Sequence, residues 1–263
     1  MEDQRQTKWF MRVQIGGVRN KLFHEHFRVA CLNGERRKKL EIAKGIHLVP
    51  GVRGANSYVV RSDDGVTIVD TGLPGNAGKI VDYVQSIGHH QSDVKTIVLT
   101  HSDLDHAGSA AQLKAETNAR VAIHEADAPR LSGEKAPKAV KGMLGLFVNL
   151  ASAIMRFTTL NPDVLLKDSD SIDSLTVIHT PGHTEGSICL YLPTRALFVG
   201  DALLTNGKGM LSLPRKSMSF DLNLAKESIR KISELEYSVL LPGHGPPIEH
   251  DASALTKAFL AGF

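Results

Sequence analysis

The sequence predicts an α+β protein in which two strand-rich halves are each flanked by helices. Short apolar runs rich in β-branched residues recur in both halves, as expected for buried strands. Longer segments with helical periodicity lie between and after these runs. With 263 residues and 42% hydrophobic content, the chain is large enough for one large core or two small ones.

The first half begins near Leu40 and holds five strand-like runs. A turn with Gly51 and Gly54 separates the first two runs, and Asp63-Asp64-Gly65 predicts a hairpin turn between the second and the third. The expected strands are 45–49, 57–60, 66–69, 97–99 and 121–124. Helices are expected over 77–87, where Gly88 stops the helix, and over 108–117.

Residues 126–168 separate the two halves. Apolar residues between 142 and 157 recur at helical spacing, and they cover more than one side of the expected helix. Such a helix needs burial on more than one face. It therefore serves as a core helix, or as a lid or dimer contact over the mouth of an active site; contact with a membrane surface is a third interpretation.

The second half repeats the strand pattern. Its expected strands are 175–178, 187–191, 196–199 and 238–241, with a Pro193-Thr194 turn between the second and third. Residues 222–235 have the spacing of an amphipathic helix.

Candidate metal ligands gather at the ends of these strands. His101, Asp103, Asp105 and His106 follow the apolar run 97–99 within six residues. A run of this kind reads as a strand buried on both faces, and its carboxyl end is where open α/β sheets place their chemistry. Imidazole and carboxylate groups are ligands for zinc and similar divalent ions.

Three later stretches complete this set of candidate ligands. His183 follows Pro181-Gly182, Asp201 follows the run 196–199, and His244 follows Pro242-Gly243. Each of the three comes shortly after a β-branched run, and the Pro-Gly dipeptides predict turns. Seven ligands are enough for two metal ions.

The four motifs in this order resemble those of the metallo-β-lactamase superfamily, over roughly residues 45–248. The resemblance implies a four-layer αββα sandwich of two facing mixed sheets, with metal ions at one edge. It implies a first metal position formed by His101, Asp103 and His183, and a second formed by Asp105, His106 and His244. Asp201 is expected to bridge them, and Asp70 resembles the family's aspartate that orients a ligand histidine; a turn-capping Asp70 is the alternative.

The sequence departs from the family's His-x-His-x-Asp-His pattern at Asp103, which stands where a second His is usual. A third carboxylate lowers the Lewis acidity of the metal and makes the site harder. Zinc is therefore the expected metal, and manganese or iron is the alternative that Asp103 favours. In a second interpretation, Asp103 points away from the site and the first metal binds weakly.

The expected reaction is hydrolysis of an ester, lactone or thioester. Two metal ions would share a hydroxide that attacks the carbonyl carbon, and Asp105 would pass the proton to the leaving group. Hydrolysis of a β-lactam by the same site is an alternative. Another is a redox reaction, as in the superfamily's diiron or persulfide dioxygenase members. A non-catalytic binding module would leave seven ligand positions without a purpose.

The composition of the chain indicates which binding partners and which cellular compartment to expect. The net charge is +3, but residues 1–44 hold 11 Lys/Arg and 5 Asp/Glu. The expected catalytic domain, 40–263, is therefore not basic, which argues against nucleic acid as a partner.

We expect a basic extension at 1–39, a helical lid-like insertion at about 130–165, and a small-molecule substrate with an apolar group. Two lone cysteines, no signal peptide and no membrane span predict a cytoplasmic protein with reduced thiols.

Overall fold

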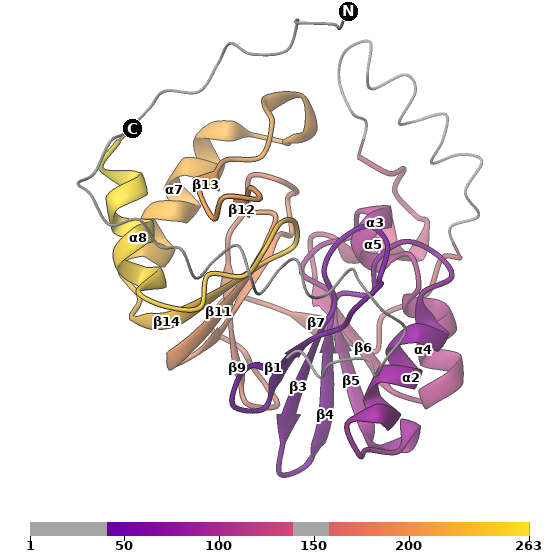
Figure 1. The fold of residues 1–263 in the computed structure, drawn as a ribbon. Coiled ribbons are helices and arrows are strands. Elements are labelled where there is room, and N and C mark those ends of the chain that lie inside the picture. Colours follow the sequence, from indigo (N-terminus) through magenta and orange to yellow (C-terminus); the bar gives the residue numbers. More distant parts are fainter. Residues whose placement is uncertain (1–40, 139–157, 263) are drawn as a thin grey trace, which may run out of the picture. The chain divides into compact units, whose positions relative to one another are not determined.

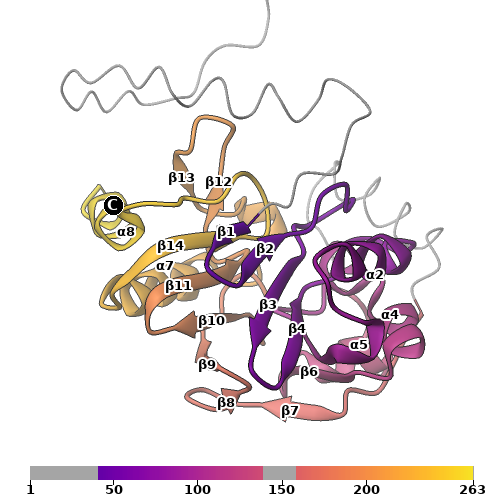
Figure 2. The same ribbon diagram turned by 60° about the horizontal axis from the view of Figure 1, so that its bottom comes forward.

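A computed structural model describes residues 41–138 and 158–262, and within them two β-sheets are stacked face to face. Helices cover the outer face of each sheet. Figures 1 and 2 show α2 (Ala77–Ser86) and α4 (Ala110–Thr117) along the first sheet, and α7 (Leu222–Ser233) and α8 (Ala252–Leu260) along the second. The predicted four-layer αββα sandwich is therefore confirmed.

The first sheet is mixed and has seven strands in sequence order. The antiparallel part comprises β1 (Glu41–Ala43), β2 (Ile46–Leu48), β3 (Tyr58–Ser62) and β4 (Gly65–Val69). The strands β5 (Val94–Val98), β6 (Arg120–His124) and β7 (Val164–Leu166) continue the sheet parallel to β4. Parallel neighbours need a crossover connection, and α2 and α4 lie in the first two of these connections.

The second sheet is also mixed, with the order β14-β11-β10-β9-β8. Its strands are β8 (Ser171–Ile172), β9 (Leu175–His179), β10 (Ile188–Leu192), β11 (Thr194–Gly200) and β14 (Tyr237–Pro242). Only β11 and β14 pair in parallel, and α7 lies in the crossover between them. A separate hairpin of β12 (Leu204–Thr205) and β13 (Leu211–Ser212) follows β11.

The core lies in three layers. Side chains of both sheets meet in the central layer, where Tyr58 packs edge-on against Phe198 with ring centroids 5.5 Å apart. The helices of the outer layers are amphipathic, so α2 buries Ile80 and Val84 against the first sheet and α7 buries Ile229 against the second. Asp221 caps α7 by accepting hydrogen bonds from two backbone N–H groups of its first turn.

The predicted strands and the Asp63-Asp64-Gly65 hairpin turn are confirmed, with ends shifted by at most three residues. The predicted helix 108–117 is confirmed as α4, which begins two residues later, and a separate short helix that was not predicted, α3 (Leu104–Ala107), precedes it. Between them, Ser109 N donates to the Thr71 hydroxyl rather than to a helical carbonyl. The sequence also did not predict α8, nor several elements too short to show a periodicity: β1, β7, β8, β12, β13, α5 (Ala128–Ser132), and the 3-10 turns at Gln91–Asp93 and Lys216–Met218.

The expected extension at 1–39 and the expected helix at 142–157 lie outside the described residues. Of the expected insertion at about 130–165, only the two ends, 130–138 and 158–165, are described. The division into extension, catalytic domain and insertion stays a prediction. Within the described ranges, no helix is both long and apolar enough to cross a bilayer. Cys189 is a buried free thiol, as predicted for this cysteine.

Candidate metal centre

Four loops carry the predicted ligands, and they meet at one edge of the sandwich. They follow β5, β9, β11 and β14 at the carboxyl ends of these strands. Backbone hydrogen bonds join the loops: Ile188 N donates to Thr100 O across the two sheets, and Gly243 N donates to Gly200 O. The short helix α3, labelled beside α5 in Figure 1, continues the first of these loops.

The structure brings all seven predicted ligands together in three overlapping groups. Within each group, one ligand atom per residue lies within 4.8 Å of the others. The groups are His101–Asp103–His183, His101–His106–Asp201 and Asp105–His106–His244. The first and third groups match the first and second metal positions expected from the sequence, and the middle group links them through shared histidines.

Asp201 lies between the two positions. Its Oδ1 is 3.3 Å from His106 Nε2 and 3.6 Å from His244 Nε2, on the side of the second position. Its Oδ2 is 3.5 Å from His183 Nε2, on the side of the first. One carboxylate oxygen therefore faces each position, which is the arrangement that a bridging ligand requires.

The second position is compact. His244 Nε2 lies 3.2 Å from Asp105 Oδ2 and 3.4 Å from His106 Nε2. Burial raises the pKa of Asp105, but the hydrogen bond from His244 and the charges of His106 and His244 together outweigh burial and lower this pKa. Burial lowers the pKa of His244, but the same hydrogen bond and the charges of Asp201 and Asp105 together outweigh burial and raise this pKa.

The first position contains a residue that the sequence analysis missed. Asp103 Oδ2 lies 3.0 Å from His183 Nε2 and 3.7 Å from His101 Nε2, so Asp103 points into the site. The same oxygen accepts a 2.6 Å ion pair from Lys138 Nζ. Although burial raises the pKa of Asp103, His183 and Lys138 hold it well below its usual range. Lys138 lies among other lysines in a polar stretch, and nothing in its sequence context marks it as part of a site.

Asp70 supports the second position from behind. Its Oδ2 is 2.8 Å from His106 Nδ1 and accepts a hydrogen bond from the Thr100 hydroxyl, while its Oδ1 accepts from Thr100 N. When His106 donates its Nδ1–H to Asp70, its Nε2 lone pair is free to bind a metal. Asp70 is 2% exposed and has a φ of 57°, which fixes its carboxylate under the ligand loop.

Burial and carboxylates set opposite protonation states for two neighbouring histidines. Burial lowers the pKa of His101 well below 6.5, and His106 and His183 lower it further, so His101 is neutral at pH 7. Burial also lowers the pKa of His106, but Asp70 and Asp201 outweigh it and raise this pKa well above 6.5. A proton therefore sits on His106 where a metal cation would bind, and metal binding here must release it.

Two glycines allow the loops to come this close. A Cβ on Gly243 would lie 2.5 Å from His106 Cε1 and 2.6 Å from Asp201 Oδ1. Gly182 has a φ of 142°, and a Cβ there would lie 2.3 Å from the backbone nitrogen of Ala225 at the start of α7. Both glycines of the two Pro-Gly-His sequences are thus needed for close approach, and Gly182 also for its positive φ.

Asp127, at the start of α5, joins the two loops of the first position and was also missed. Its Oδ2 accepts hydrogen bonds from Ser102 N, Ser102 Oγ and Thr184 Oγ1 at 2.8–2.9 Å. Its Oδ1 accepts from Gly186 N at 2.9 Å. Ser102 lies between two predicted ligands and Thr184 follows a third, so one fully buried carboxylate holds both loops in register.

Replacing Asp127 by Asn should destabilise the fold around the first position. An amide has one acceptor oxygen instead of two, so at least one buried donor loses its partner, at a cost of about 1–3 kcal/mol in the free energy of unfolding. Urea denaturation of the metal-free protein measures this change. Asp170→Asn is the matched control, since exposed Asp170 accepts one local hydrogen bond, from Lys167 N. Equal stability of the two variants would contradict the role of Asp127.

The seven side chains offer only imidazole nitrogens and carboxylate oxygens, which suit zinc and other divalent ions. His101 Nε2 is buried and has no hydrogen-bond partner among the described residues. A buried polar atom without a partner is costly, and a metal at this edge would supply one. The residues present therefore fit a divalent metal, and the ligand role of each residue stays a prediction.

The neighbouring nucleophilic side chains are unsuited to covalent catalysis. Burial raises the pKa of the Cys189 thiol to about 12, so it is protonated at neutral pH. The Ser102 hydroxyl donates to Asp127, and no histidine contacts it among the described residues. The arrangement therefore favours activation of a water rather than attack by a side chain.

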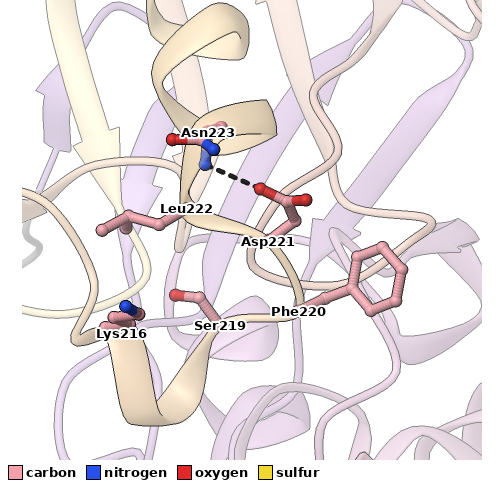
Figure 3. Close-up of a pocket in the computed structure, with 6 residues that line it drawn as sticks. All are labelled: Lys216, Ser219, Phe220, Asp221, Leu222 and Asn223. Carbon is pink, nitrogen blue, oxygen red and sulfur yellow. Dashed lines mark hydrogen bonds between the residues drawn. The ribbon is translucent and has the colours of Figure 1, made fainter.

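A pocket of about 280 Å³ lies along the turn that leads into α7. Lys216 and residues 219–223 line it, and in Figure 3 the Phe220 ring and the Leu222 side chain point to opposite sides of this turn. Phe220 N donates to His183 O, so the turn is tied directly to the first position. Phe220 is 47% exposed and offers an apolar surface there.

Comparison with known proteins agrees with this geometry. The family model described as the metallo-beta-lactamase superfamily matches residues 50–244. The probable metallo-hydrolase YflN of Bacillus subtilis strain 168 is 30% identical over 229 residues, which cover 79% of this chain and 86% of YflN. The human acyl-coenzyme A thioesterase MBLAC2 is 27% identical over 209 residues, covering 72% of each chain.

A solved structure is similar as well. A metallo-beta-lactamase family protein of Thermus thermophilus superposes with a TM-score of 0.65 at 25% sequence identity, over 84% of this chain and 80% of that protein. The family match spans all four ligand-bearing loops. The chain therefore belongs to the metallo-beta-lactamase superfamily and is a metallo-hydrolase.

Proposed function

We propose that this metallo-hydrolase cleaves an ester, lactone or thioester, with two divalent metal ions, preferably zinc, bound at the two positions. The position of Asp201 carries the proposal, because one of its oxygens faces each group of ligands. Bound divalent ions would lower the pKa of a water toward about 7 and polarise the substrate carbonyl.

Residues of this chain would bind the two metal ions. His101, Asp103 and His183 would bind at the first position, and Asp105, His106 and His244 at the second. Asp105 has an exposed edge, since 39% of its side chain is accessible, so it can also exchange a proton with a leaving group or with solvent. We assign it this second role in the proposed mechanism.

Exposed apolar side chains beside the centre support a substrate with an apolar group. The backbone N–H of Phe220 donates to His183 O. Met210, which is 48% exposed, lies in the β12–β13 hairpin. Thr205 of that hairpin donates its N–H to His244 O. The activity named for the human relative, acyl-coenzyme A thioesterase, is chemistry of this class, and we extend it to this chain as part of the proposal.

A panel of substrates tests the proposed function. Protein loaded with zinc, and separately with manganese, is assayed on an acyl-coenzyme A thioester, an aryl ester, a lactone and a β-lactam. We expect the highest kcat/KM on one of the first three, rising when the acyl chain is lengthened. Hydrolysis of the β-lactam alone, or no hydrolysis by protein with two bound metals, would refute the proposal.

A further inference from the structure

The ammonium group of Lys138 lies at the first metal position. Its Nζ lies 2.6 Å from Asp103 Oδ2, 2.9 Å from His183 Nε2 and 3.1 Å from His183 O. An ammonium group has three protons to donate; Asp103 Oδ2 and His183 O accept, and His183 Nε2 accepts in the tautomer that carries its proton on Nδ1. The Lys138 side chain is only 9% exposed, so the contact is largely shielded from solvent.

The atoms that hold Lys138 are the atoms that the first metal would need. Asp103 Oδ2 and His183 Nε2 belong to the group His101–Asp103–His183, and each contacts the ammonium. A metal and an ammonium group cannot both occupy this space, because both are cations and they share two of three ligands. Binding of the first metal therefore requires Lys138 to leave.

Within the part of the chain that the structure describes, the second position has no such competitor. Among the described residues, the charged groups that pair with Asp105 and His244 are each other and Asp201, and no Lys or Arg is among them. His106 faces Asp70 and Asp201. The two positions therefore differ in what a metal must displace: an anchored ammonium group lies at the first, and no Lys or Arg of the described residues lies at the second.

We propose that Lys138 competes with the metal ion for the first position, so that the chain fills its second position first and its first position only by expelling Lys138. The inference rests on the proposed metal-dependent function and concerns how that site is loaded. Lys138 thus sets the metal stoichiometry at a given metal concentration. While the first position holds Lys138, its ammonium group supplies the positive charge beside Asp103.

Zinc titration of the metal-free protein tests the competition. Calorimetry with metal analysis should resolve two zinc sites of unequal affinity in the wild type. Lys138→Met removes the charge and keeps the length of the side chain, and it should tighten the weaker site at least about tenfold, which corresponds to about 1.4 kcal/mol. Lys135→Met is the matched control: Lys135 lies in the same segment but pairs with Glu185, and it should leave both affinities unchanged.

A second measurement uses the wild-type protein and therefore does not require that a variant folds. Lys138 should resist amine acetylation in the metal-free and one-zinc protein, and should become labelled at saturating zinc, when mass spectrometry of the peptide reports its release. Unchanged labelling at saturating zinc, or equal affinities of wild type and Lys138→Met, would overturn the competition. Failure of the wild type to bind any zinc would instead refute the proposed function, so the two failures are distinct.

Discussion

Asp201→Ala is expected to abolish hydrolysis and to reduce the bound metal. The carboxylate faces both positions, at 3.3 Å from His106 and 3.5 Å from His183, so its removal takes a ligand from each. Loss of residues that merely support ligands costs about 10–100-fold in affinity or activity, and a shared ligand should cost more than about 100-fold in kcat. Metal analysis and steady-state kinetics measure the two effects.

The ionised state of Asp201 explains why an amide cannot replace it. Burial raises its pKa, but the neighbouring His106, His183 and His244 outweigh burial and hold this pKa well below its usual range. Asp201→Asn keeps the volume and removes the charge, so we expect it to lose nearly as much activity as Asp201→Ala. Asp64→Asn, in the exposed hairpin turn, is the control and should behave as wild type. Full activity of Asp201→Asn with two metals retained would refute a bridging role.

Asp70→Asn should weaken metal binding at the second position by about 10–100-fold without unfolding the protein. Asn tolerates the left-handed backbone that Asp70 adopts, with a φ of 57°, so the turn is kept. The amide cannot accept from Thr100 N, from the Thr100 hydroxyl and from His106 Nδ1 at once, as the carboxylate does. His106 therefore loses the partner that fixes its tautomer. Zinc affinity by competition with a chelating dye measures the loss.

Asp173→Asn is the matched control for Asp70→Asn. Asp173 also has a positive φ, of 50°, and its carboxylate binds Thr67 and Arg120 at the opposite end of β9 from the metal centre. Its replacement should lower stability slightly and leave zinc affinity unchanged. Equal zinc affinities for wild type and Asp70→Asn would show that Asp70 only caps its turn.

Most of the fold was predictable because its strands have clear local signals. Apolar β-branched runs mark β3 to β6 and β9 to β11, and a turn signal such as Asp63-Asp64-Gly65 depends only on adjacent residues. The helix predicted over 108–117 begins two residues later than expected, because Ser109 N donates to the hydroxyl of Thr71, 38 residues earlier. Local periodicity carries no information about such a partner.

The candidate side chains of the centre could be selected from the sequence alone. His101, His183, Asp201 and His244 each follow a strand-like run, and strands that stack in two sheets bring their ends to one edge. Spacing therefore selected the residues, while their roles as ligands stay predictions. Asp70 was also found this way, since it ends a strand at the same edge.

The surroundings of these side chains depend on the tertiary structure. Lys138 reaches His183 across 45 residues, and Asp127 reaches Ser102 and Thr184 across 25 and 57 residues. Neither residue stands in a motif, because a hydrogen bond between distant segments requires only that a donor and an acceptor meet in space. The competition at the first position follows from such a meeting: the ammonium of Lys138 lies where Asp103 and His183 converge.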